Sequence, residues 1–154
     1  VAYVPSGTGQ VESSSDYGIT YTGIDGLTVG VAGGEINSAA ATQDVTNMYA
    51  TYAMDAFTVG IQASESDSET ASSDKDFSAM GISYAVSEDL SVSINTSTID
   101  FESATLTDQE ATGLSVSYTM GSMTLKAAHN TVDNVAGASA ADRSAYDLSL
   151  AFAF

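Results

Sequence analysis

The chain has 154 residues, of which 20 are acidic and only 3 are basic, so that its formal net charge is -17. This charge excludes a nucleic-acid-binding protein, because phosphates are bound by clustered Lys and Arg, and it excludes a helix that lies on an anionic membrane surface. Because 44% of the residues are nevertheless hydrophobic, acidic and apolar residues must be separated in space rather than mixed in a disordered chain.

Several other classes of protein are excluded by what the sequence lacks. The chain has no Cys, so neither a disulfide framework nor a thiolate metal site is expected. It has no run of 18 apolar residues, the minimum for a transmembrane helix. It opens with Val-Ala-Tyr-Val-Pro and no basic region, so we expect no signal peptide, and a chain that is mature or a piece of a longer protein.

Alternation of hydrophobic with small or polar residues runs through almost the whole chain and predicts β-strands. The first expected strand, 16–24, places Tyr17 and Ile19 on one face. The dipeptide at 25–26 is Asp-Gly, a strong signal for a two-residue hairpin, because both positions tolerate positive φ. The strand at 27–37 is expected to pair back on the first.

The same unit repeats to the end of the chain. Further strands are expected at 44–54, 57–65, 76–86, 90–101, 110–120, 123–133 and 144–154. Tight turns at 25–26, 55–56, 87–89 and 121–122 alternate with longer polar loops at 38–43, 66–75, 102–109 and 134–143. About nine strands long enough to cross a bilayer when tilted, with one short end and one long end, predict an all-β, antiparallel transmembrane barrel.

The two faces of these strands differ in side-chain size. Large apolar residues occupy one face, while Gly, Ala, Ser, Thr, Asn and Gln occupy the other. Because a soluble barrel fills its interior with bulky side chains, we expect the large face to contact lipid and the small face to contact water. His129, the only histidine, is expected on the lipid side. Aromatic residues are expected in interfacial girdles, or in part at trimer contacts: Tyr17, Tyr21, Tyr52, Tyr84, Tyr118, Tyr146, Phe152 and Phe154.

The last strand resembles the C-terminal strand of Gram-negative outer-membrane proteins, which ends in Phe after alternating apolar residues. The segment that matches is Tyr146-Asp-Leu-Ser-Leu-Ala-Phe-Ala-Phe154. The resemblance implies an assembly signal that the outer-membrane assembly machinery reads. Its residues would be Tyr146, Leu148, Leu150, Phe152 and Phe154.

The whole chain resembles the C-terminal half of general diffusion porins, particularly those of α-proteobacteria. The resemblance lies in the closing strand and in hairpins such as Tyr17-Gly-Ile-Thr-Tyr-Thr-Gly-Ile-Asp-Gly-Leu-Thr-Val-Gly-Val. It implies that residues 1–154 are the C-terminal part of one 16-stranded barrel domain. Residues 1–4 would then end the seventh strand, 5–15 would be an outside loop, and 16–24 would be the eighth strand.

The function that this resemblance implies is that of a water-filled channel, usually a homotrimer, for passive diffusion of small hydrophilic solutes and ions. It also implies a bacterial outer-membrane location, in contact with lipid and lipopolysaccharide. No catalytic residue is expected, so the candidate site is a polar wall. By strand parity the pore-lining residues are Thr20, Thr28, Gln62, Ser83, Ser93, Asn95, Ser115, Ser117, Lys126, Asn130, Asp147 and Ser149.

Charged residues give three further expectations. Lys126, the only basic residue within an expected strand, could tune ion passage or offset neighbouring carboxylates. An acidic loop could bind Ca²⁺ or Mg²⁺ and so bridge to lipopolysaccharide, or simply be solvated; its residues are Glu65, Asp67, Glu69, Asp74 and Asp76. No other cofactor is expected. The large negative charge is expected to favour cations over anions near the pore mouths.

Two alternatives remain open at this stage. The chain could be a small closed barrel of 8 or 10 strands with a filled interior, acting as an anchor or adhesin. It could also be a soluble extracellular β-sandwich. Conductance separates the porin from the small barrel, and a requirement for detergent separates both from the sandwich.

Overall fold

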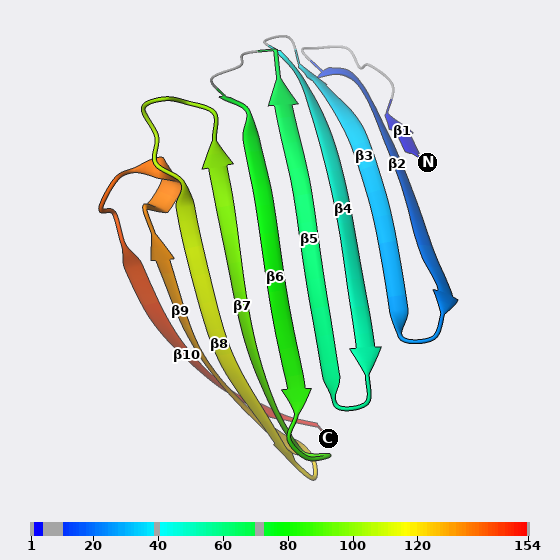
Figure 1. Ribbon diagram of the computed structural model, residues 1–154, viewed down its shortest axis with the longest axis vertical. Coiled ribbons are helices and arrows are strands. Elements are labelled where there is room, and N and C mark those ends of the chain that lie inside the picture. Colours follow the sequence, from blue (N-terminus) through cyan, green and yellow to red (C-terminus); the bar gives the residue numbers. More distant parts are fainter. Residues whose placement is uncertain (1, 5–10, 39–40, 70–72, 154) are drawn as a thin grey trace.

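The structure, a computed structural model, is a single antiparallel sheet of ten strands in the order of the sequence, so that every strand pairs with its neighbours in the chain (Figure 1). It describes residues 2–4, 11–38, 41–69 and 73–153. The strands are β1 Ala2–Val4, β2 Val11–Ile24, β3 Leu27–Ser38, β4 Thr42–Met54, β5 Phe57–Ser68, β6 Lys75–Ala85, β7 Leu90–Phe101, β8 Gln109–Met120, β9 Met123–Asp133 and β10 Arg143–Phe152.

The predicted all-β antiparallel class is confirmed, with nine long strands and the short β1. A 3-10 turn at Val135–Gly137 lies in the connection between β9 and β10. Within the described ranges, no helix is long and apolar enough to cross a membrane.

The tight turns form where the sequence predicts them. Gly26 has a φ of 73°, and a Cβ at this position would overlap with the carbonyl oxygen of Ala53 on the neighbouring hairpin. In the next turn the residue with positive φ is Asp55, whose φ is 51°. Because these turns hold the hairpins in register, alternation is preserved through most of the sheet. The exception is β2, whose register against β3 shifts between Val11 and Ser14 and between Tyr21 and Ile24.

The strands extend further than predicted at the end of the sheet that carries the longer loops. β2 begins at Val11, so 11–15 is strand rather than part of an outside loop; residues 5–10 lie outside the described part. The loop predicted at 66–75 shrinks in the same way, because β5 runs to Ser68 and β6 begins at Lys75. The added segments 12–15 and 66–68 contain only Ser, Glu and Asp, so backbone pairing continues where the alternation of hydrophobic and polar residues is no longer visible.

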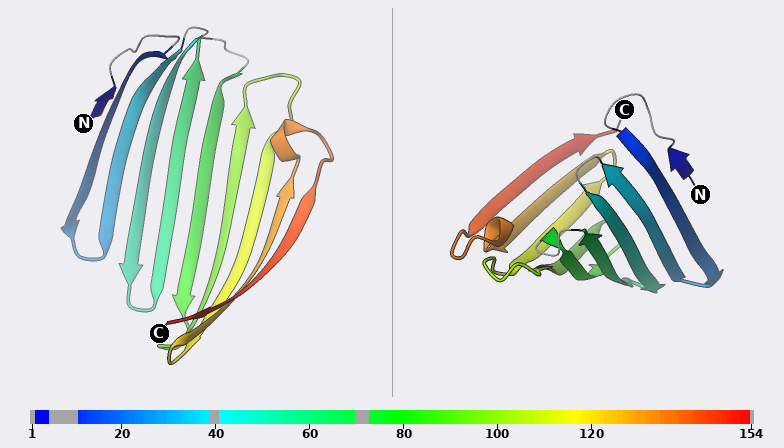
Figure 2. Two further views of the ribbon diagram at one scale, coloured as in Figure 1. Left: turned by 180° about the vertical axis from the view of Figure 1, so that it is seen from behind. Right: turned by 90° about the horizontal axis from the view of Figure 1, so that it is seen from above.

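The sheet is strongly curved, and Figure 2 shows it from above as an open curve rather than a flat layer. Exposure alternates along β8, where the odd-numbered residues from Gln109 to Thr119 are partly or fully covered and the even-numbered residues are exposed. Side chains on the concave side of a curved sheet converge and shade one another, so the odd-numbered residues of β8 face the concave side. We call this the polar face, and the opposite, convex side the apolar face.

The sheet has no hydrophobic core of its own. Among the described residues, none is a buried hydrophobic, whereas the exposed fraction is 70% for Ile19, 83% for Tyr146 and 74% for Leu148. These side chains lie on the apolar face and form a continuous surface far larger than the patches that soluble monomers expose. Burial of apolar area drives folding, so this surface requires apolar surroundings.

Candidate functional site

The strand register brings the predicted wall residues onto one surface. Thr28, for example, lies in a row that crosses the sheet through Gly60 and Asn95 to Asn130. The polar face carries all the residues predicted to line a pore, namely Thr20, Thr28, Gln62, Ser83, Ser93, Asn95, Ser115, Ser117, Lys126, Asn130, Asp147 and Ser149. That this face lines a water-filled pore remains a prediction.

Short polar side chains on this face bond to one another along the wall. The hydroxyls of Ser93 and Ser115 are 2.7 Å apart, and the amide nitrogen of Gln62 donates to the side-chain oxygen of Asn47 at 2.8 Å. Such bonds between neighbouring strands satisfy some of the hydrogen-bond donors and acceptors of the wall and keep these side chains close to the sheet. The middle of the wall is therefore lined mainly by short polar groups, whereas toward the longer loops the same face also carries Phe77, Ile99 and Phe101.

Tyr49 is a wall residue that the sequence did not identify. It lies on the polar face of β4, with its hydroxyl 3.3 Å from the hydroxyl oxygen of Thr20, and its ring covers Gly30. The sequence was ambiguous here because Tyr49 and Tyr52 fall on opposite faces of the same strand. The glycine directly across from Tyr49 was the available signal, since a large ring lying flat on a sheet requires a missing side chain beneath it.

The expectation that Lys126 is the only basic residue within a strand is wrong. Lys75 begins β6 and Arg143 begins β10, because both strands start one residue earlier than predicted. The register places Lys75, Lys126 and Arg143, which are all the Lys and Arg of the chain, on the polar face.

The apolar face carries a band of large side chains that ends in carboxylates toward the longer loops. Eight residue steps separate Phe57 from Glu65 and ten separate Leu90 from Asp100, with Ala63 on β5 and Thr96 and Thr98 on β7 standing between the large side chains and the carboxylates. At about 3.4 Å per residue and a tilt of about 40°, this corresponds to a height of roughly 20–26 Å, close to the apolar band of outer-membrane barrels. We name the bordering carboxylates the acidic row: Glu35, Asp44, Glu65, Asp67, Asp76, Asp100, Glu110 and Asp133.

The residues predicted as an acidic metal-binding loop lie partly in strands. Glu65 and Asp67 belong to β5 and Asp76 to β6, whereas Glu69 and Asp74 lie in the connection between the two strands. In the part of the chain that the structure describes, no three His, Cys, Asp or Glu residues are grouped as metal ligands. Metal binding by this segment therefore remains a prediction.

Carboxylates of the acidic row face one another directly across neighbouring strands. Asp76 lies opposite both Glu65 on β5 and Asp100 on β7. Like charges in directly opposed positions destabilise a sheet.

We therefore expect Asp76→Asn to stabilise the protein by about 0.2–1 kcal/mol for each opposed pair that it relieves. The measurement is thermal unfolding of the purified protein in detergent with a chelator present. Asp147→Asn is the control, because Asp147 faces Ala128 rather than a carboxylate. A lower unfolding temperature for Asp76→Asn would contradict the prediction.

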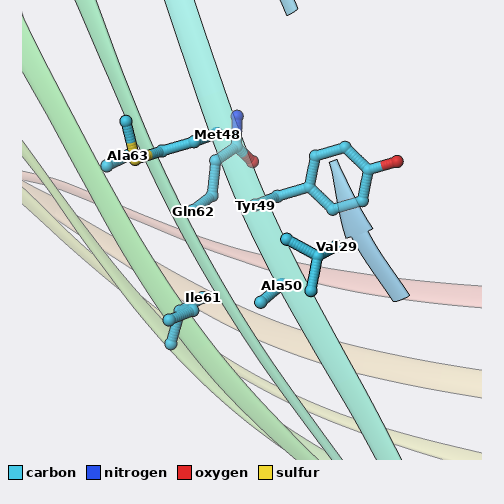
Figure 3. A pocket seen from close by; sticks show the side chains of 7 residues that line it. All are labelled: Val29, Met48, Tyr49, Ala50, Ile61, Gln62 and Ala63. Carbon is cyan, nitrogen blue, oxygen red and sulfur yellow. The ribbon is translucent and has the colours of Figure 1, made fainter. Parts of the chain in front are cut away.

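The hollows of the sheet are shallow and do not form an enclosed site. Figure 3 shows one of them, between β3, β4 and β5, lined by Val29, Met48, Tyr49, Ala50, Ile61, Gln62 and Ala63. It forms where Ala50 and Ala63 interrupt the larger side chains of the apolar face. His129 is also on this face, as predicted by parity, and its ring stacks on that of Tyr146 with centroids 4.3 Å apart.

The residues of the predicted assembly signal lie on the edge strand β10. Tyr146, Leu148, Leu150 and Phe152 all project from the apolar face and are exposed, and Phe154 lies outside the described residues. Among the described strands, β10 pairs only with β9. That the outer-membrane assembly machinery recognises these residues remains a prediction.

Comparisons with known proteins found a family model and solved structures that are similar to this chain. A family model described as Gram-negative porin matches residues 1–154. Among solved structures, a triple mutant of the porin of Rh. blastica matches with a TM-score of 0.69 and 19% identity, covering 92% of this chain and 46% of that one. The KdgM porin matches over 92% of both chains with a TM-score of 0.34 and 12% identity. No curated protein sequence matches the chain.

Proposed function

Because the chain belongs to the Gram-negative porin family, we propose that its sheet forms part of the wall of a channel for passive diffusion of small hydrophilic solutes and ions. Its place is the bacterial outer membrane. One observation carries the proposal: a curved sheet without a buried core has large apolar side chains on its convex face and mainly short polar ones over the middle of its concave face. Lipid on one side and water on the other satisfy both faces.

The complete channel that we propose is a barrel of 16 strands. The chain spans 46% of the length of the Rh. blastica porin mutant, and the described sheet leaves the outer edges of β1 and β10 without a partner strand. Open edges cannot lie in hydrocarbon, since every backbone N–H and C=O must be paired there. Additional strands would pair both edges and close the wall.

The partners that we propose follow from the convex face. The apolar band would contact lipid, and part of it would contact two further copies in a homotrimer. The acidic row lies just above the band, at the level where anionic lipopolysaccharide would be bridged by Ca²⁺ or Mg²⁺ held between carboxylates. The assembly machinery would engage the last strand through Tyr146, Leu148, Leu150, Phe152 and Phe154.

The proposed function is tested by single-channel recording of the native protein, purified from outer membranes and reconstituted in a planar bilayer. We expect large conductance steps that occur in groups of three, because each barrel of a trimer conducts separately. The intact mass should be taken from the same sample. A folded protein that inserts but does not conduct would contradict the proposal and favour the small filled barrel, in which the polar face packs as a core.

A further inference from the structure

We propose that Lys75, Lys126 and Arg143 draw anionic solutes into the channel, although the chain as a whole is strongly acidic. This inference rests on the proposed function, because it requires the polar face to line the lumen. It reverses the expectation from net charge alone, which predicts a preference for cations. The reason is that the sheet sorts charged residues between its two faces.

The sorting follows directly from the strand register. All three basic residues lie on the polar face, and all eight carboxylates of the acidic row lie on the apolar face. Among strand residues whose side chains the structure describes, the carboxylates on the polar face are Asp16 and Asp147. The concave surface of these strands therefore has a slight excess of positive charge within a chain of net charge -17.

The cations on the polar face are not offset by the residues directly opposite them. Lys126 faces Ser117 on β8 and Ser149 on β10. Lys75 faces Ser66 on β5 and Phe101 on β7, and its ammonium group lies 5.8 Å from the centre of the Phe101 ring. Arg143 faces Val132 on β9, so none of the three cations has a carboxylate directly opposite it on the concave side.

Carboxylates on the apolar face act on the lumen much more weakly. They point away from it and are separated from it by the sheet itself, and ions in the outer aqueous layer screen them within about 10 Å at 0.1 M salt. Position on a face, rather than the number of charges in the chain, therefore decides which residues a permeating ion senses.

Lys75 and Asp76 provide a matched pair for the test, because they are consecutive residues at the same depth of β6 with side chains on opposite faces. The measurement is the reversal potential of the native, full-length channel in a KCl gradient, at about 10 mM on the dilute side, where the screening length is about 30 Å. The variants are Lys75→Gln, Lys126→Gln and Asp76→Asn, with Asp147→Asn as a carboxylate of the polar face.

We expect Lys75→Gln and Lys126→Gln each to raise the ratio of cation to anion permeability by about two- to threefold, the effect of one unit charge about 10 Å from an ion in water. Asp147→Asn should lower that ratio, and Asp76→Asn should lower it by much less, because its carboxylate points away from the lumen. The inference is overturned if Asp76→Asn shifts the ratio as much as Lys75→Gln does, or if both lysine variants leave it unchanged. Absence of any conductance in the unmodified protein would instead overturn the proposed function.

Discussion

Leu114→Arg is expected to prevent stable assembly in the membrane, whereas Ser115→Arg, one residue further along β8, should still assemble. Leu114 lies near the middle of the apolar band, between Ile94 and His129 on the neighbouring strands, and 52% of it is exposed. An Arg at the bilayer midplane on the lipid face of a barrel costs about 2–4 kcal/mol. At Ser115, the same side chain would extend into water on the polar face.

The measurement is heat-modifiable migration on a gel, supported by the amount of each variant recovered from outer membranes. Unmodified protein and Ser115→Arg should migrate as folded species before heating, and Leu114→Arg should be recovered in small amounts and unfolded. Equal folding of both variants would show that Leu114 does not face lipid. Failure of both would show that β8 is too closely packed on the concave side to admit Arg, contrary to the small side chains found there.

The sequence was sufficient to predict the class of fold, because period-two alternation and tight turns are local signals. Gly26 and Asp55 adopt positive φ in their turns, and the structure has turns at both predicted places. The upper ends of the strands were predicted less well. There Glu65 and Asp76 pair across β5 and β6 on a face that has changed from apolar to charged, so that side-chain type no longer distinguishes strand from loop.

Residues were assigned to the wall by deciding, for each strand, which alternate residues face it. The assignment was limited where the sequence did not show which set of alternate residues that was. Residues such as Ser93 and Asn130 were placed on the polar face from alternation alone. Tyr49 was not among the predicted wall residues, because Tyr49 and Tyr52 fall on opposite faces of one strand and the size of a tyrosine does not decide between the faces. The sorting of charge was missed for a different reason: net charge is a sum over the chain, whereas the field in a lumen depends on the side of the sheet from which each charge projects.

Gly30→Ala is expected to displace the ring of Tyr49 from the wall and narrow the lumen. A Cβ at position 30 would overlap with that ring, which already lies flat on the sheet. Because the concave side is open, the ring can rotate away from the sheet, at the cost of the contact between its hydroxyl and that of Thr20. Loss of one such hydrogen bond corresponds to about 0.5–1.5 kcal/mol, so the protein should fold with slightly lower stability and smaller conductance.

Gly60→Ala is the matched control, because it adds the same methyl group to the same face of the sheet. A Cβ at Gly60 would lie 3.5 Å from the Cγ2 of Thr51, an ordinary van der Waals contact. Conductance and unfolding temperature should then be unchanged. Tyr49→Ala combined with Gly30→Ala should restore conductance, because the displaced ring is the obstruction. If Gly30→Ala conducts as the unmodified protein does, the ring is accommodated elsewhere and Tyr49 does not limit the lumen.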